Sequence, residues 1–449
     1  MNTGFKSSTA VFAILAALAF GASPAASADL GGDCCADLEE RIAELEATTA
    51  RKGNRKVKLE VSGQVNEAIL WWDDGVESNA GVYTNDDSRT RFRFRGSAKI
   101  SDDFSAGYLL EIGSRGANSK RFTQDNPDGD PEVGLDLRHS VWYLDSKKFG
   151  RVWVGLTGGA GENVTEVNLA ATAAIAKYSD VEDTGLGLIS LVDGVQTGVQ
   201  WRRFIRDGGD QPGEGRRYNM VRYDTPEFMG FIATVNWGED DVWEVGLRYK
   251  TDFQGFKLAA AVAYGESTYL PSNTTFAGIQ CPGSVASNNP DTDCQQVGGS
   301  MSIMHEPTGL YFNAAAGYME DNVVQFESGV DNVDNEYSFW AIEAGIERKY
   351  WDLGKTTIFA QYYDNDGGTV DRSFTAGGTT YDSVVSSNLE MFGTGIVQGI
   401  DKAAMDIYLV YRHYWGDATV EDTQPGLNPT ATFDLDDLDV VMGGGIIRF

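Results

Sequence analysis

The stretch RTRFRFRG, residues 89–96, indicates the kind of sheet that this chain forms. Arginine occupies every second position, and Thr90, Phe92 and Phe94 stand between the arginines. Successive side chains of a β-strand point to opposite faces. As a strand, the stretch has one cationic face and one largely aromatic face, whereas a helix would spread both kinds of side chain around its circumference. The pattern predicts a strand that separates water from an apolar medium.

The same alternation recurs along the chain from Val57 to Phe449. It is clear in DVWEVGLRYK (241–250), FKLAAAVAYG (256–265) and WAIEAGIERKYW (340–351), and aromatic residues recur at the ends of these segments. Turn-rich stretches such as NPDGDPE (126–132), RDGGDQPGEG (206–215) and QPGLNPT (424–430) separate them. Segments of about ten alternating residues with aromatic ends and turns between them are typical of a transmembrane β-barrel. An all-β, antiparallel barrel over residues 57–449 is therefore predicted.

A soluble β-sandwich is the alternative, because its strands also alternate apolar and polar residues. Two features favour the barrel. The polar faces carry small residues and charges of both signs, as a water-filled lumen would, and the apolar faces use Ala, Gly and Tyr freely. The sandwich also does not account for so long a chain with no second domain.

The N-terminus has the features of an export signal. Lys6 precedes an apolar run from Val11 to Phe20, and Ala26-Ser27-Ala28 forms a small-x-small cleavage site. These features predict a signal peptide over residues 1–28. The apolar run is too short for the alternative, a membrane-anchoring helix. Residues 29–56 are expected to form a short helical or coiled-coil leader followed by a basic linker.

Composition excludes several classes of function. The formal net charge of −30 argues against a nucleic-acid partner, because phosphate binding needs surplus Lys and Arg. The chain has three histidines and no Cys-x-x-Cys pair, so we expect no metal centre and no cofactor, although acid-rich loops would suit divalent cations. Export permits disulfides, and Cys281 with Cys294 is the candidate pair, a staple within one loop.

The C-terminus ends in a strand pattern. In LDVVMGGGIIRF (438–449), Val441, Ile447 and Phe449 share one face. A strand that closes on a final aromatic residue resembles the last strand of bacterial outer-membrane barrels, where the assembly machinery reads this ending. Phe449 is therefore the expected assembly signal.

Several stretches, taken in order, resemble the general bacterial porins, in particular those of alphaproteobacteria. They are RFRFRGSA (91–98), FSAGYLLEIG (104–113), RHSVWYLDSKKFGRVWVGL (138–156) and NMVRYDTPEFMGF (219–231). The resemblance implies a barrel of about 16 strands, assembled as a homotrimer in the bacterial outer membrane, through which small hydrophilic solutes and ions diffuse passively. An 18-stranded sugar channel is also compatible with the length. The helical leader departs from the simplest porins.

The resemblance also implies a constriction. Residues near 157–217 would fold into the lumen as the third extracellular loop, and ATAAIAKYSD (171–180) is helix-prone. The expected acids of this loop are Glu162, Glu166, Asp180, Glu182 and Asp183.

Arginines are expected on the barrel wall opposite the loop. Arg91 and Arg138 match positions that porins use, and Arg222 points inward by alternation. Further lumen candidates are Arg93, Arg95 and Arg115. An arginine facing lipid near the midplane costs about 2–4 kcal/mol, so a row of them must face water. Acids and arginines on opposite sides would set up a field across the pore.

Three other functions are compatible with a surface-exposed barrel. A substrate-specific channel would need an aromatic track, for which Trp71, Trp72, Trp201, Tyr362 and Tyr363 are available. An outer-membrane enzyme would need a nucleophile beside a base, but His139 and Ser140 fall on opposite faces of one strand. A purely structural surface protein or adhesin is the third. The expected partners are membrane lipid and lipopolysaccharide.

Overall fold

The computed structural model describes residues 57–129, 134–206, 210–238, 242–269, 291–322, 332–370, 372–422 and 430–449. The chain divides into two units, residues 1–53 and 54–449, and all described residues belong to the second. The predicted signal peptide (1–28) and helical leader (29–56) lie outside the described residues and stay predictions.

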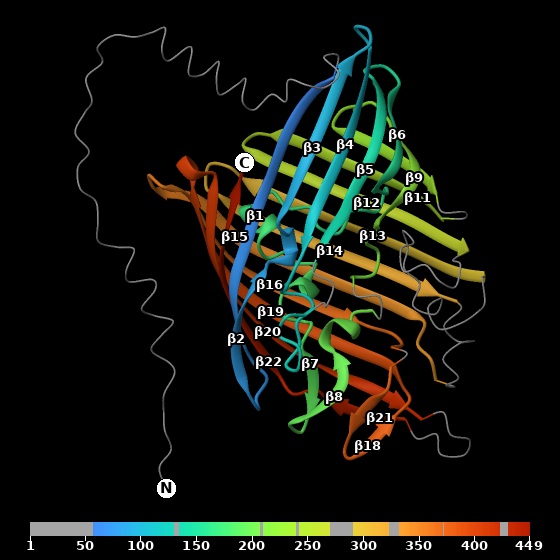
Figure 1. The fold of residues 1–449 in the computed structure, drawn as a ribbon, viewed down its shortest axis with the longest axis vertical. Helices are drawn as coiled ribbons and strands as arrows, with labels where there is room; N and C mark the ends of the chain where they lie inside the picture. Colours follow the sequence, from blue (N-terminus) through green and yellow to red (C-terminus); the bar gives the residue numbers. More distant parts are fainter. Residues whose placement is uncertain are drawn as a thin grey trace. The chain divides into compact units, whose positions relative to one another are not determined.

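The described chain is almost entirely β-structure (Figure 1). Its strands are β1 (Lys58–Asp73), β2 (Ser78–Thr84), β3 (Arg91–Lys99), β4 (Phe104–Arg115), β5 (Gly134–Ser146), β6 (Gly150–Gly158), β7 (Ile189–Val192), β8 (Val195–Gln200), β9 (Arg217–Asp224), β10 (Phe231–Gly238), β11 (Val242–Phe253), β12 (Phe256–Tyr269), β13 (Asp291–His305), β14 (Leu310–Asp321), β15 (Glu336–Trp351), β16 (Gly354–Asp366), β17 (Phe374–Ala376), β18 (Thr379–Tyr381), β19 (Ser383–Ile400), β20 (Met405–Glu421), β21 (Ala431–Asp434) and β22 (Leu438–Arg448). Single 3₁₀ turns are η1 (Asp86–Ser88), η2 (Ala171–Ala174), η3 (Val181–Asp183), η4 (Trp201–Arg203) and η6 (Asp401–Ala403). Among these residues, no helix has the length and apolarity to cross a membrane.

The main sheet closes on itself. Each neighbouring pair is antiparallel, and β22 pairs with β1 from Arg448 opposite Gln64 to Asp439 opposite Asp73. β2 and β3 both pair with β1, along successive halves of it, so they are two parts of one interrupted strand. β21 and β22 are related in the same way to β20. Counting each interrupted strand once, the 18 segments of the main sheet make a closed barrel of 16 strands within the described residues.

The prediction of an antiparallel barrel with about 16 strands is thus confirmed, and the 18-stranded alternative is wrong. The length of the chain alone did not distinguish 16 strands from 18. Many residues lie in segments that leave the barrel wall, so the chain is longer than a minimal barrel of 16 strands needs. The largest of these is the connection between β6 and β9.

Alternation along the strands divides an apolar exterior from an interior. Phe94 lies opposite Val61, whose side chain is 48% exposed, and the Phe92 and Phe94 rings meet edge to face with centroids 5.7 Å apart. On the other face of β3, Arg93 lies opposite Glu111 and bonds to it. The two faces of the RTRFRFRG stretch are therefore separated as a lipid-facing wall requires.

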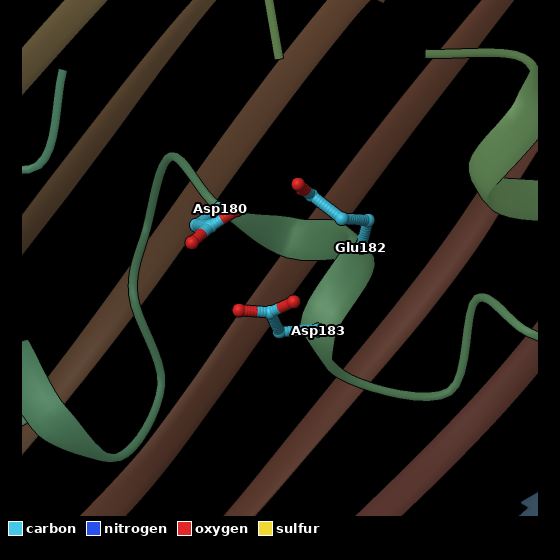
Figure 2. Close-up of side chains that lie close together, drawn as sticks. All are labelled: Asp180, Glu182 and Asp183. Atoms are coloured by element: carbon cyan, nitrogen blue, oxygen red, sulfur yellow. The ribbon is translucent and has the colours of Figure 1, made fainter. Parts of the chain in front are cut away.

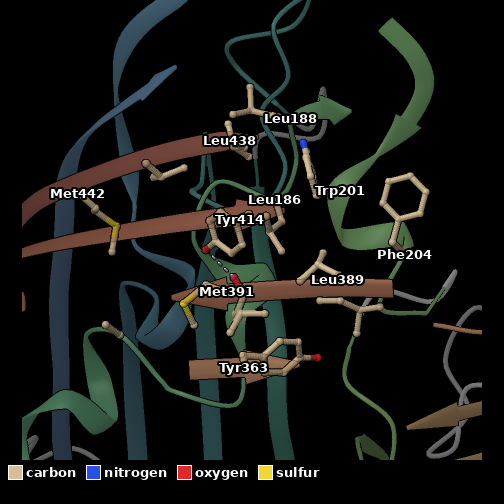
Figure 3. Packing of buried hydrophobic residues seen from close by; sticks show 14 of the residues in the cluster. Leu186, Leu188, Trp201, Phe204, Tyr363, Leu389, Met391, Tyr414, Leu438 and Met442 are labelled. Atoms are coloured by element: carbon tan, nitrogen blue, oxygen red, sulfur yellow. Dashed lines mark hydrogen bonds between the residues drawn. The ribbon is translucent and has the colours of Figure 1, made fainter. Parts of the chain in front are cut away.

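Part of the interior departs from the expectation of a polar lumen. Most inward residues of β16, β19, β20 and β22 are apolar, and side chains of the 159–216 connection cover them. Figure 3 shows Leu186, Leu188, Trp201 and Phe204 of the connection near Tyr363, Leu389 and Tyr414 of the wall. Both faces of these strands are largely apolar because one faces lipid and the other faces this internal core.

The chain end lies in the seam that closes the barrel. The backbone N–H groups of Gly63 and Phe449 each donate to the other residue's carbonyl, at 2.9 and 3.1 Å. A Cβ at position 63 would lie 2.6 Å from the Phe449 ring, so glycine leaves room for the terminal aromatic side chain.

Candidate pore constriction

A break in one wall strand brings acids into the barrel. Between Thr84 and Arg91 the chain has more residues than the facing part of β1, and the excess folds inward as η1. The Asn85 side chain accepts from the N–H of Asp87 and donates to the carbonyl of Ile175, at 3.1 and 2.9 Å. The buried Asp86 and Asp87 therefore sit in the lumen beside the 159–216 connection.

The 159–216 connection, hereafter the inner segment, crosses the barrel interior. Wall side chains from several directions hold its backbone. Asn66 donates to the carbonyl of Ala174 at 3.4 Å, Gln361 to Ala176 at 2.7 Å, Arg412 to Lys177 at 2.6 Å, and Ser300 to Val164 at 2.5 Å. These residues come from β1, β16, β20 and β13. The helix-prone stretch 171–180 contributes only the single turn η2.

Glycines set how closely the inner segment approaches the wall. A Cβ on Gly317 would lie 2.0 Å from the carbonyl oxygen of Pro212, and one on Gly298 would lie 2.3 Å from that of Gly213. Gly213 itself has φ +83°, a conformation that side chains disfavour. At this point backbone lies on backbone, and larger residues would push the inner segment away from β13 and β14.

One polar cavity of about 420 Å³ lies between the inner segment and the wall. Its charged lining residues can be divided into a mainly cationic group and a mainly acidic group. The first comprises Arg89, Arg91, Arg93, Arg138, Arg217, Glu111 and Glu162. The second comprises Asp86, Asp87, Glu166, Asp180, Asp183, Asp210, Glu214, Lys120, Lys177 and Arg216. Arg89 and Asp86, 3.0 Å apart, link the two groups.

The cationic wall is organised around one carboxylate. Glu111 on β4 is 1% exposed and accepts from Arg93 Nε at 2.6 Å and Arg138 Nε at 2.8 Å, while Arg91 Nη1 lies 3.6 Å away. A register shift beside Glu111 makes Arg138 an extra residue of β5, so that Arg138 and His139 both face inward. Strict alternation from the exposed Trp142 would have turned Arg138 outward.

The other expected arginines occupy different places. Arg222 is outside the cavity lining and donates to Asp224 and to the Gly158 carbonyl at 2.9 Å each. Arg95 lies further along β3, opposite Glu60, and is exposed. The side chain of Arg115 is outside what the structure describes.

The acidic side of the cavity is bound to two lysines. Lys120, from the β4–β5 connection, lies 3.3 Å from Glu182, 3.1 Å from Asp183 and 3.0 Å from Asp210. Lys177 lies 2.9 Å from Glu166 and 2.7 Å from Asp180. Figure 2 shows Asp180, Glu182 and Asp183 turned toward one another, with one oxygen of each within 4.8 Å of the others. Hard cations favour such oxygen ligands, but the Lys120 ammonium already contacts two of the three.

Burial and crowding change the protonation of these loop acids. Burial raises the pKa of Glu166 to about 7, although the neighbouring Lys177 ammonium opposes the shift. Burial raises the pKa of both Glu182 and Asp183, and the nearby charge of Asp180 is the second cause in the same direction. Burial also disfavours the charged form of Asp180, but Lys177 outweighs it and holds the pKa of Asp180 below its usual value.

Of the predicted residues, Arg91, Arg93, Arg138, Glu162, Glu166, Asp180 and Asp183 line the cavity, and Glu182 is buried beside it. Sequence reasoning missed Lys120, Lys177, Arg217 and the two aspartates of η1. Arg217 follows the inner segment directly and pairs with Glu162, but alternation gave no sign of η1 or of Lys120.

The remaining predictions fall elsewhere. Cys294 is disulfide-bonded, while Cys281 lies outside the described residues, so their pairing stays a prediction. None of the five proposed track aromatics lines the cavity. Trp72, Trp201 and Tyr363 belong instead to the internal apolar core.

Comparison with known proteins gives a family and a fold. Residues 13–420 match the family model described as Gram-negative porin. An anion-selective porin from Comamonas acidovorans has a TM-score of 0.52 and 14% identity, with 88% of this chain and all of that one covered. OmpF of Salmonella typhi has a TM-score of 0.47 and 13% identity, and the match covers 88% of this chain and 98% of the OmpF chain. The OmpT of Vibrio cholerae with loop L8 deleted has a TM-score of 0.49 and 11% identity, and the match covers 88% of this chain and 100% of that one. No curated protein sequence matches.

Proposed function

We propose, from the premise that this chain belongs to the Gram-negative porin family, that it lets small hydrophilic solutes and ions diffuse through the outer membrane. The protein is an outer-membrane channel. The observation that supports this solute class best is the cavity of about 420 Å³, lined by charges of both signs, inside a barrel with an apolar exterior.

The channel would select solutes by the fixed charges that line its cavity. Arginines on β3, β5 and β9 face carboxylates of the inner segment and η1 across the cavity. Fixed charges replace part of the hydration of a polar solute and offer nothing to an apolar one. A bulky apolar solute would have to displace water bonded to these charges.

Planar-bilayer recording tests the proposal. Purified native protein should give discrete, ohmic conductance steps in potassium chloride, and heat-denatured protein should give none. Arg91→Ala should shift the reversal potential toward cations, since it removes one cation from the cavity. Native protein that inserts into the bilayer without conducting would contradict a diffusion channel.

The assembly and membrane partners follow as further parts of the proposal. We assign a homotrimer in lipid with lipopolysaccharide around it. Carboxylates on the long connections would bind divalent cations that bridge to lipopolysaccharide phosphates. Cross-linking in outer-membrane vesicles tests the trimer. Lipopolysaccharide retention that is unchanged by a chelator would contradict the bridging.

We propose no enzymatic role. His139 lies 3.2 Å from the Thr157 hydroxyl, and Ser140 pairs with Leu110 on the outward face. Ser140 therefore cannot use the neighbouring His139 as its base, because an activated nucleophile needs its base within hydrogen-bond reach. Hydrolytic activity that is lost in His139→Ala would contradict this assignment. A specific sugar channel is less well supported, because its candidate aromatic residues are outside the cavity lining.

A further inference from the structure

Strand β2 is paired along only one of its edges. From Ser78 to Thr84 it pairs with β1, and within the described residues its other edge has a single bridge, from Thr84 to Asn118. Every second backbone N–H and C=O before that bridge therefore points away from β1. An unpaired edge offers a row of backbone donors and acceptors. This edge lies at the barrel end with the long connections, which is the extracellular end of outer-membrane barrels.

A polar cavity of about 190 Å³ lies along this edge. Residues 79–83 of β2 line one side of it, and residues 123–124 and 127–128 of the β4–β5 connection line another. The connection is fixed to the inner segment, because Gln124 donates to the Ile189 carbonyl and accepts from the Ile189 N–H, at 2.8 Å each. None of the described residues that line this cavity also lines the constriction. The cavity is therefore a second site, separate from the constriction.

Tyr83 is held in this cavity with its polar end unused. It is 4% exposed, and its ring stacks on Phe122 with centroids 4.2 Å apart. Its hydroxyl lies over Gly81, where an added Cβ would be 2.4 Å from the oxygen, and both residues line the cavity. The hydroxyl has no hydrogen bond to any residue that the structure describes, whereas buried hydroxyls are normally bonded. Packing thus fixes the ring and leaves the hydroxyl for a ligand.

Three further polar side chains line the same cavity. The Asn79 carbonyl oxygen accepts from the N–H of Ala80 at 2.8 Å, which leaves the amide nitrogen as a donor. The Thr123 hydroxyl accepts from the N–H of Asn126 at 2.9 Å and keeps its own hydrogen to donate. The Asp128 carboxylate is not hydrogen-bonded within the described part of the chain, and it is an acceptor. The cavity therefore offers donors and acceptors side by side.

This mixture selects a class of ligand. A hydroxyl group both donates and accepts, whereas an ammonium only donates and a carboxylate only accepts. A carboxylate would also meet the like charge of Asp128. The volume is below the roughly 300–1,000 Å³ of pockets for drug-sized ligands, so it suits one small ring. An extended peptide, which can pair with an open strand edge, has no room because residues 123–128 face that edge.

We propose that this cavity binds one neutral polyhydroxylated ring, that is, a single sugar unit. Tyr83 and Asn79 bond its hydroxyls from the β2 side, and Asp128 accepts from them on the side of the connection. The site goes beyond the proposed channel function, because a solute that crosses the constriction does not need it. The sugar comes either free from solution or as the terminal unit of a surface glycan, and the recognising chemistry is the same.

Saturation-transfer NMR on the native protein tests the site, in a detergent without a sugar headgroup. Glucose, galactose and N-acetylglucosamine form the free-sugar arm, and core oligosaccharide from lipopolysaccharide forms the glycan arm. Methylammonium, which only donates, and acetate, which only accepts, are the controls. We expect saturable binding in at least one sugar arm and at least tenfold weaker binding of both controls. The arm that binds more tightly identifies the source of the sugar.

Two variants and a matched control locate the site. Tyr83→Phe keeps the stacked ring and removes only the hydroxyl, so sugar affinity should fall about tenfold, as for one lost hydrogen bond. Asn79→Ala, at an exposed position, should have a similar effect and keeps the test usable if Tyr83→Phe does not fold. Tyr350→Phe changes an exposed tyrosine of β15 near a short turn and should bind sugar like native protein.

Each result bears on one claim. Sugar binding that is absent from both arms, or equal in Tyr83→Phe and Tyr350→Phe, would overturn the site, as would a control that binds as tightly as sugar. Both tyrosine variants should conduct like the native channel, since neither residue lines the constriction. Lost sugar binding therefore leaves the proposed channel intact, whereas native protein without conductance removes the channel and not this site.

Discussion

At the scale of single residues, the Glu111 carboxylate organises the cationic wall. It is nearly inaccessible and contacts three arginines from two strands. The arginine ladder was predicted from a resemblance and from alternation. The acid that holds it together was in the printed sequence, but nothing local distinguishes it from other strand glutamates.

Replacing Glu111 by alanine should destabilise the barrel and strengthen its preference for anions. The substitution leaves three guanidiniums without their shared acceptor, and a lost hydrogen bond to a charged partner costs about 1.5–3 kcal/mol. Loss of one negative charge should also shift the reversal potential toward anions. The measurements are the thermal unfolding midpoint in detergent and the zero-current potential in a salt gradient. An unchanged midpoint would contradict the bonding role of Glu111.

Gly317 tests how the inner segment is seated. In Gly317→Ala, the added methyl group would lie 2.0 Å from the Pro212 carbonyl oxygen, so the inner segment must move away from β14. We expect altered single-channel conductance with more current noise. Gly443→Ala, whose added Cβ would meet its nearest atom at 3.5 Å, is the control and should conduct normally. Equal traces for the two variants would show that this close approach does not position the inner segment.

At the scale of elements, the cavity belongs to four separate parts of the chain. Wall strands supply the arginines, the inner segment supplies most of the acids, η1 adds two aspartates, and the β4–β5 connection adds Lys120. The predicted loop acids share this cavity with cations that neutralise them in part. The charge of the inner segment therefore depends on which carboxyls are ionised.

Glu166 should make cation preference depend on pH. Its pKa is raised to about 7 by burial. The carboxyl is mostly neutral below this pH and charged above it. Cation preference should therefore increase as the pH rises from about 6 to about 8, a range that extends roughly one unit on either side of that pKa. Reversal potentials across this range measure the effect. Glu166→Gln should flatten the curve, and a curve that Glu166→Gln leaves unchanged would assign the titration to another group.

At the scale of the whole molecule, charge is distributed along the barrel as well as across it. Lysines such as Lys99, Lys147, Lys148 and Lys402 lie at or beside short turns, whereas Asp321 and Asp366 end β14 and β16, which lead into long connections. With a formal net charge of −30, the acidic entrance should attract cations.

This long-range effect should depend strongly on salt. The screening length falls from about 30 Å at 0.01 M to about 3 Å at 1 M salt. Cation preference in a tenfold potassium chloride gradient should be larger at low salt and approach the value set by the cavity at high salt. Selectivity that is independent of salt would place its source entirely in the cavity.

The sequence by itself determined the strands, their two faces, the terminal aromatic strand and the barrel class, because a pleated strand converts sequence parity directly into inside and outside. Only the tertiary structure decided that the inner faces of β16, β19, β20 and β22 are covered by an apolar core, that η1 turns inward, and that Lys120 meets the loop acids. These contacts join residues far apart in the chain. Parity is a local property and carries no information on which distant segments fill a lumen.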